Sequence, residues 1–127
     1  MEAKHNRILV VDDDDSIRVM VERVLRREKF EVDSARDGFE AIEKLSENDY
    51  GTILLDLMMP RVDGHGVLQF LQKHRPDKAQ SVIIMTANLP AGVDAAKAQP
   101  IFRVLSKPFD IQQLVENVRD CSRSEER

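Results

Sequence analysis

Four short apolar segments of the sequence each end at side chains that could take part in chemistry. These side chains are three carboxylates, a hydroxyl and an ammonium group, namely Asp12, Asp13, Asp56, Thr86 and Lys107. If the segments are parallel strands, all five groups meet at the carboxyl edge of one sheet, where open α/β sheets bind their ligands. Clustered carboxylates with a hydroxyl and an ammonium group predict a phosphate site that works with a metal ion.

The acidic residues indicate which metal ion to expect. Neighbouring carboxylates repel one another, and at least one would take up a proton unless a cation neutralised them. A site rich in oxygen ligands suits Mg²⁺. Lys107 and Thr86 would then stabilise a phosphoryl group that passes to a carboxylate. Asp56 is the best candidate for this nucleophile, because its segment lies between the aspartate pair and the segments that carry Thr86 and Lys107.

Each of these residues also has an ordinary structural explanation. An Asp after a strand is often a helix cap, which accounts for Asp14 or Asp15 at the start of the first expected helix. Thr86 could simply end a strand, and Lys107 could be a solvated surface charge. Four such coincidences at one sheet edge are much rarer than one, so we favour a functional site.

Length and composition limit the classes of protein to consider. We expect one domain over residues 1–127, with a core at about 7–121 and frayed ends. The net charge is −4 and Lys and Arg are scattered, so direct nucleic-acid binding is not expected. No apolar run is long enough for a membrane span, and no signal peptide is evident. The single cysteine, Cys121, fits a reduced, cytoplasmic protein.

The hydrophobic pattern predicts five strands that alternate with five helices. Continuous apolar runs are typical of strands buried on both faces, and apolar residues at helical spacing predict the helices. The strands are expected at 8–11, 30–35, 52–55, 82–85 and 102–106, and the helices at about 15–29, 39–48, 67–75, 90–100 and 111–118. Short connections and right-handed crossovers turn this alternation into a doubly wound parallel sheet with helices on both faces.

Together the motifs resemble the receiver domain of two-component response regulators, over nearly the whole chain. Ile8–Asp14 is similar to the opening acidic motif of that family, and Leu55–Pro60 with Asp63–Gly64 resembles its phosphoacceptor loop. Thr86–Ala87 matches the position of the switch hydroxyl, and Ser106–Phe109 matches the lysine-proline motif. The combination is highly specific, although no single motif is.

The resemblance implies a flavodoxin-like (βα)5 fold with strand order 2-1-3-4-5. A histidine kinase or phosphotransfer protein would donate a phosphoryl group to Asp56. Mg²⁺ would be bound by Asp13, Asp56 and the backbone carbonyl of Met58, with Asp12 acting directly or through water. The chain would catalyse only its own phosphorylation and dephosphorylation, and would therefore not be an enzyme for a separate substrate.

The resemblance also assigns the remaining site residues. Lys107 would pair with the phosphoryl oxygens, and Thr86 would bond to the phosphoryl group and so move the loop after the fourth strand. The Lys107–Pro108 bond would be cis, which is found for only about 5% of such bonds in folded proteins. The phosphorylated state would act on an unidentified downstream protein, or on an output domain outside this chain.

Some positions depart from the family pattern. Val104 stands where receivers usually have Tyr or Phe, and Phe102 is expected on the same strand face without replacing that ring. Gln99–Ile101 replaces the usual Gly-Ala before the last strand. We therefore expect an atypical output region between the fourth and fifth strands, with looser coupling or a different signalling surface. Met58 and Asn88 each lie two residues after a site residue, where they would control the access of water.

Three alternatives have some support. A phosphohydrolase of the haloacid dehalogenase type also uses an Asp nucleophile and Mg²⁺, but Ser16 stands where Thr or Val is expected, and no cap domain fits in this length. A flavodoxin relative would need Ser, Thr and Gly after the first strand to bind phosphate, and Asp12–Asp15 stands there. A pseudo-receiver that only binds partners is disfavoured because all the key residues are present.

Overall fold

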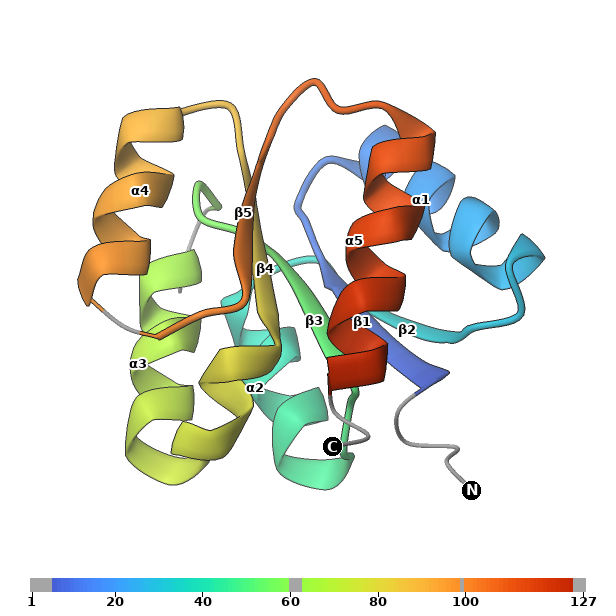
Figure 1. Ribbon diagram of the computed structural model, residues 1–127. Coiled ribbons are helices and arrows are strands. Elements are labelled where there is room, and N and C mark those ends of the chain that lie inside the picture. Colours follow the sequence, from blue (N-terminus) through green and yellow to red (C-terminus); the bar gives the residue numbers. More distant parts are fainter. Residues whose placement is uncertain (1–5, 60–62, 99, 125–127) are drawn as a thin grey trace.

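The computed structural model describes residues 6–59, 63–98 and 100–124, and it shows a central sheet with helices on both sides (Figure 1). Five strands alternate with five α-helices, and a short 3₁₀ helix, η2, precedes the fourth strand. In chain order the elements are β1 (Arg7–Val11), α1 (Asp15–Arg27), β2 (Glu31–Ala35), α2 (Gly38–Glu47), β3 (Thr52–Asp56), α3 (Gly64–His74), η2 (Pro76–Ser81), β4 (Val82–Thr86), α4 (Leu89–Ala98), β5 (Arg103–Ser106) and α5 (Ile111–Ser124).

The five strands are parallel and lie in the order β2-β1-β3-β4-β5. This confirms the flavodoxin-like fold and the strand order that the resemblance implied. The register places Asp56 beside Met85, and Thr86 beside Ser106. The residues that end these strands therefore share one edge of the sheet.

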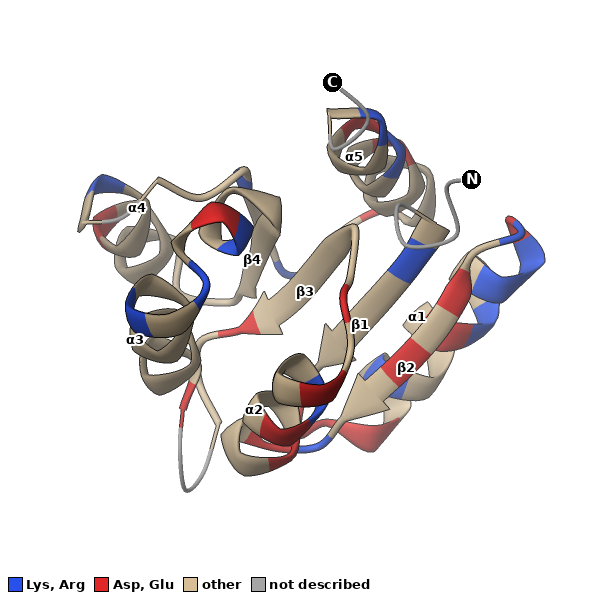
Figure 2. Ribbon diagram, turned by 90° about the horizontal axis from the view of Figure 1, so that it is seen from below, with Lys and Arg blue, Asp and Glu red and all other residues tan. Residues whose placement is uncertain are grey.

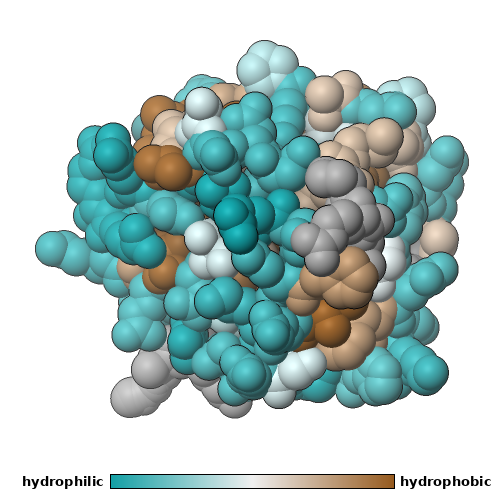
Figure 3. All heavy atoms as spheres, turned by 180° about the vertical axis from the view of Figure 1, so that it is seen from behind, coloured by the Kyte–Doolittle hydropathy of each residue, from teal (hydrophilic) through white to brown (hydrophobic). Residues whose placement is uncertain are grey.

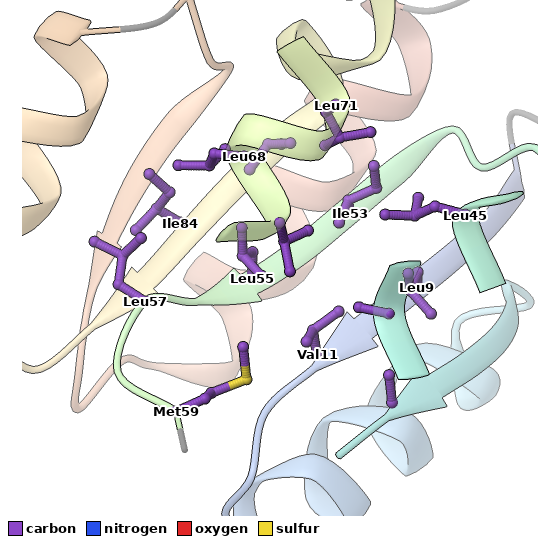
Figure 4. Packing of buried hydrophobic residues seen from close by; sticks show 14 of the residues in the cluster. Leu9, Val11, Leu45, Ile53, Leu55, Leu57, Met59, Leu68, Leu71 and Ile84 are labelled. Carbon is purple, nitrogen blue, oxygen red and sulfur yellow. The ribbon is translucent and has the colours of Figure 1, made fainter. Parts of the chain in front are cut away.

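Each face of the sheet has its own hydrophobic layer. The first layer packs against α2, α3 and α4, and it contains Leu9, Ile53 and Ile84 of the sheet together with Leu45 and Leu71 of the helices (Figure 4). The second layer packs the other sides of the strands against α1 and α5. Its buried members are Ile8, Val10, Val21, Leu25, Phe30, Val32, Leu54, Ile83, Met85, Leu105, Leu114, Val118 and Cys121.

Burial on both faces explains why the central strands are continuous apolar runs. Every residue of β3 and β4 is buried. A side chain that projects into either layer must be apolar, so polar groups are confined to the strand ends. Figure 2 shows this for β3, which carries an acidic residue only at its end.

The face shown in Figure 3 is mostly hydrophilic, and its hydrophobic atoms form separate small patches. Lys and Arg occur on several helices together with Asp and Glu (Figure 2). Among the described residues, no helix combines the length and apolar character that crossing a membrane requires.

Several element boundaries differ from the sequence prediction. α3 begins at Gly64 rather than near residue 67, because Asp63 caps it by accepting the Gly66 N–H at 3.2 Å. α5 continues to Ser124, beyond the end near residue 118 that the sequence predicts. Residues 60–62 of the expected loop, and Gln99, lie outside the described residues.

The pattern did not predict η2, which is fixed by long-range contacts. The ammonium of Lys78 is buried and donates to the carbonyl oxygen of Tyr50 at 3.0 Å. It also lies 3.1 Å from the carboxylate of Asp49, which forms a second ion pair with Arg75. These partners come from the segment before β3, so the local sequence alone does not reveal them.

The expectation that Phe102 and Val104 share a face of the last strand is wrong. Phe102 packs against the layer of α1 and α5, whereas Val104 packs against the layer of α2, α3 and α4. The alternation fails because β5 begins at Arg103, so Phe102 precedes the strand. Phe102 therefore does not supply a ring at the position of Val104.

The end of α1 contains a residue in a left-handed conformation. Lys29 has a φ of 75°. Its N–H donates to the carbonyl of Arg26 at 3.0 Å, and the Phe30 N–H donates to the carbonyl of Leu25 at 3.1 Å. This is the Schellman pattern of helix ends, in which Gly usually occupies the left-handed position.

We predict that Lys29→Gly stabilises the protein by about 0.5–1 kcal/mol, because relief of the β-carbon clash outweighs the greater chain entropy of Gly. Urea unfolding of both proteins measures the change. Lys29→Ala is the control, since it removes the charge and keeps the β-carbon. An equal gain in the Ala variant would show that charge, and not backbone strain, is responsible.

Candidate functional site

The structure brings the acidic residues and Lys107 together at the carboxyl edge of the sheet. Carboxylate oxygens of Asp12, Asp13 and Asp56 lie within 4.8 Å of one another. The ammonium of Lys107 lies 2.8 Å from Asp12 Oδ2 and 3.5 Å from Asp56 Oδ2. Asp12 and Asp56 are buried, while Asp13 is exposed. The arrangement is a partly buried acidic cluster in which the ammonium of Lys107 pairs with Asp12 and Asp56.

The turn from β1 to α1 positions the aspartate pair. Asp14 is the N-cap of α1 and accepts the Ile17 N–H at 3.1 Å, so Asp14 rather than Asp15 is the cap. The Asp14 N–H in turn donates to Asp12 Oδ1 at 2.9 Å. Both carboxylate oxygens of Asp12 are therefore held, one by this amide and the other by Lys107.

Arg18 also fixes this turn, and nothing in the local sequence pattern indicated this. Its guanidinium is buried and donates to the backbone carbonyl of Asp12 at 3.0 Å and to Asp15 Oδ1 at 2.6 Å. On a helix that carries several other arginines, nothing in the local pattern distinguishes this one. Its contact with the Asp12 backbone helps to hold the turn that carries the two acids.

Asp56 is held by its own loop and by the start of α3. Its Oδ1 accepts the Met58 N–H at 3.2 Å. A β-carbon added at Gly64 would lie 2.6 Å from the Asp56 carbonyl oxygen and 2.5 Å from Leu57 Cα. Only Gly permits this approach of α3 to the backbone of the Asp56 loop. Met59 is buried, whereas Met58 is 59% exposed.

Thr86 is buried next to this cluster, but its hydroxyl bonds elsewhere. The hydroxyl oxygen accepts the Asn88 N–H at 3.0 Å, and the hydroxyl donates to the Asn88 carbonyl at 3.3 Å. The Thr86 carbonyl accepts the Lys107 N–H at 2.8 Å, which ties the ends of β4 and β5 together. The Lys107–Pro108 bond is cis, as the resemblance implied.

The charges in the cluster shift two pKa values. Burial of the Asp56 carboxyl and the charge of Asp12 raise the pKa of Asp56 to about 6, although Lys107 and the Met58 N–H oppose this. Burial alone would lower the pKa of Lys107, but its hydrogen bond to Asp12 and the charges of Asp12 and Asp56 raise it. Lys107 is thus a cation at neutral pH that faces more negative charge than it can balance.

This excess of negative charge fits a hard divalent cation. The available donors are carboxylate oxygens of Asp12, Asp13 and Asp56, and hard cations such as Mg²⁺ prefer oxygen ligands. The backbone carbonyl of Met58 lies in the same loop as Asp56. The residues present therefore suit Mg²⁺ in both charge and donor type.

Comparison with known proteins agrees with this description of fold and site. The sequence profile of the response regulator receiver domain matches residues 8–119. The transcriptional regulatory protein SrrA of Staphylococcus aureus is 39% identical over 119 residues, which are 90% of this chain and 46% of SrrA. The chain thus spans about half the length of this relative.

Solved structures show the same similarity. The receiver domain of the Francisella response regulator 1452 is 29% identical in sequence and has a TM-score of 0.83. The matched region covers 94% of this chain and 98% of the Francisella domain. The response regulator TrrA of Thermotoga maritima, solved in complex with Mg(2+)-BeF, is 32% identical in sequence and has a TM-score of 0.79. The matched region covers 91% of this chain and 97% of TrrA. The chain belongs to the receiver domain family of two-component response regulators.

We predict that Asp56→Asn stabilises the protein in the presence of a chelator at pH 7. Because the pKa of Asp56 rises from 3.8 to about 6 on folding, the folded state binds more protons than the unfolded state between these values. Stability contributed by this group is therefore lost as pH rises through that window. The Asn variant avoids the loss, and we expect it to gain about 1–3 kcal/mol at pH 7 and little near pH 4.

Urea unfolding at several pH values measures this gain. Asp77→Asn, at an exposed aspartate in η2, is the control and should show no pH-dependent gain. Added Mg²⁺ should reverse the order, because it stabilises the wild type and not the Asp56→Asn variant. A gain that is the same at pH 4 and pH 7 would contradict the prediction.

Proposed function

We propose that this chain is a phosphoryl-accepting receiver in which Asp56 is the acceptor. The observation that supports this most directly is the position of Lys107, whose ammonium lies between Asp12 and Asp56 at the edge of the sheet. A buried carboxylate with a raised pKa beside a fixed cation is suited to accept a group whose charge the cation can balance. Asp56 ends β3, which lies between β1 and β4 in the sheet.

In the proposed transfer, an Asp56 carboxylate oxygen forms a bond to phosphorus as the bond from phosphorus to its donor breaks. With a phosphohistidine donor, the electron pair of that bond stays on the imidazole nitrogen. Lys107 balances charge on the phosphoryl oxygens, and the Thr86 hydroxyl turns from Asn88 to donate to one of them. Little further covalent chemistry is needed, since positioning and charge neutralisation dominate such reactions.

We further propose that the acidic cluster binds Mg²⁺ through Asp13, Asp56 and the Met58 carbonyl, with Asp12 acting directly or through water. When bound, the ion would neutralise charge on the phosphoryl oxygens. The residues of the chain supply the rest: Lys107 holds Asp12 in place, and the Met58 amide orients the carboxylate of Asp56. The chain would act on no separate substrate.

The proposed partners follow from this chemistry. A histidine kinase or phosphotransfer protein would supply the phosphoryl group, and a downstream protein or an output domain outside this chain would respond to it. SrrA, of which the chain covers 46%, is a transcriptional regulatory protein by name. We place residues 7–121 in a single receiver unit with a cytoplasmic location, and we expect this unit itself not to bind nucleic acid.

The experiment that tests the function is incubation with Mg²⁺ and acetyl phosphate, followed by intact mass measurement. We expect the wild type to gain the mass of one phosphoryl group, and Asp56→Asn to gain none. Lys107→Ala should react about 10²-fold more slowly, because it lacks the cation that balances the phosphoryl charge. Asp77→Asn is the control and should react like the wild type.

Three results would count against the proposal: reaction at another residue, reaction in the presence of excess chelator, or no reaction of the wild type. Turnover of a generic phosphate ester would favour the phosphohydrolase alternative, and we expect none. A protein that binds its partners without any reaction would fit the pseudo-receiver alternative.

A second prediction concerns the lifetime of the phosphorylated state. Met58 is exposed beside Asp56, where its apolar side chain would keep water from the acyl phosphate. We expect Met58→Asn to release phosphate several-fold faster than the wild type. Met58→Leu, which keeps an apolar side chain, should resemble the wild type. Equal rates for all three proteins, measured by mass after removal of acetyl phosphate, would exclude shielding by Met58.

A further inference from the structure

A glycine of α4 lies directly against the ends of β4 and β5. Gly92 is buried, and a β-carbon added to it would lie 2.8 Å from Val104 Cγ1 and 2.9 Å from Thr86 Cγ2. Real β-carbons do not approach other atoms so closely, and no described glycine has a positive φ. Gly92 is therefore required for space and not for an unusual backbone conformation.

Hydrogen bonds connect the same residues through Asn88. The Thr86 hydroxyl bonds to both the N–H and the carbonyl of Asn88. That carbonyl also accepts the Gly92 N–H at 3.1 Å, a bond of the first turn of α4. The Asn88 side chain accepts the Ala91 N–H at 3.2 Å and caps the helix. We call Thr86, Asn88, Gly92 and Val104 together the α4 anchor.

We infer that Gly92 is a positioning residue, which keeps the Thr86 hydroxyl on Asn88 and so makes its release depend on movement of the first turn of α4. A rotation of Thr86 about χ1 moves its hydroxyl and its methyl group together, because both are bonded to the same β-carbon. The hydroxyl then leaves Asn88, and the methyl group leaves its contact with Gly92. Both contacts belong to one helical turn, so the turn and the side chain change together.

The side chain of Val104 packs against the same glycine as the Thr86 methyl group. Val104 Cγ1 lies on Gly92 beside the Thr86 methyl group, so the two side chains form one surface under α4. A group added at Val104 Cγ1 would press on the backbone of α4 at Gly92. We therefore expect the backbone of the first turn of α4 to move when Thr86 rotates. The second half of this inference, that the released hydroxyl reaches a phosphoryl group, rests on the proposed function.

Gly92→Ala tests the inference because it places a methyl group inside the anchor. Ala normally stabilises a helix relative to Gly, so a looser first turn in this variant cannot come from helix propensity. Without any phosphodonor, we expect the amides of residues 88 and 92 to exchange hydrogen at least about threefold faster than in the wild type. With Mg²⁺ and beryllofluoride, a phosphoryl analogue, we expect tighter binding than in the wild type.

Two further variants separate the contact from a general effect on stability. Asp94→Ala, at an exposed position of α4, should change neither measurement. In a Val104→Ala background, which removes one of the two crowded groups, Gly92→Ala should have less than half of its effect. If Gly92→Ala does not fold, Val104→Ile replaces it, since one more methyl group presses on Gly92 and should act in the same direction.

The outcomes distinguish this inference from the proposed function. Unchanged exchange at residue 88 in Gly92→Ala and Val104→Ile would overturn the anchor, whether or not the wild type is phosphorylated. Faster exchange with unchanged beryllofluoride binding, in a protein that accepts phosphoryl groups, would overturn the link to Thr86. Faster exchange in a protein that never accepts a phosphoryl group would support the anchor and refute the proposed function.

Discussion

The mutual repulsion of Asp12, Asp13 and Asp56 is the constraint on which the rest of the site depends. Their oxygens lie within 4.8 Å of one another, and two of the three side chains are buried. Lys107 balances part of this charge from 2.8 Å, but burial and the charge of Asp12 still raise the pKa of Asp56. A fold that maintains such a cluster must hold its backbone firmly, as Gly64 does by bringing α3 against the Asp56 loop.

The two-sided burial of the sheet determines where this chemistry can occur. Because β3 and β4 are buried along their whole length, ionised groups are tolerated only at their ends. This is why the sequence allowed the strands, their parallel order and the acidic edge to be predicted. The apolar runs mark the strands, and the first polar residue after each run marks the edge. The cis Lys107–Pro108 bond followed from the resemblance alone, since the spacing of residues does not reveal it.

The features that could not be predicted depend on contacts between distant segments. Arg18 is one of several arginines on α1, and only the folded chain shows its guanidinium on the Asp12 carbonyl. η2 depends on the burial of Lys78 against Tyr50. Phe102 was placed on the wrong face because the start of β5 cannot be read from alternation when the strand has only 4 residues. Each case involves a local pattern that fits several environments equally well.

The packing of α4 relates the departure at position 104 to Gly92. Taken alone, Val104 in place of an aromatic residue suggested looser coupling or a different signalling surface. In the structure Val104 packs on the α4 backbone, since an added β-carbon at Gly92 would be only 2.8 Å from Val104 Cγ1. A small residue on β5 and a glycine on α4 therefore belong to one packing arrangement. Close packing permits few intermediate positions, so the first turn of α4 is expected to shift in a single step.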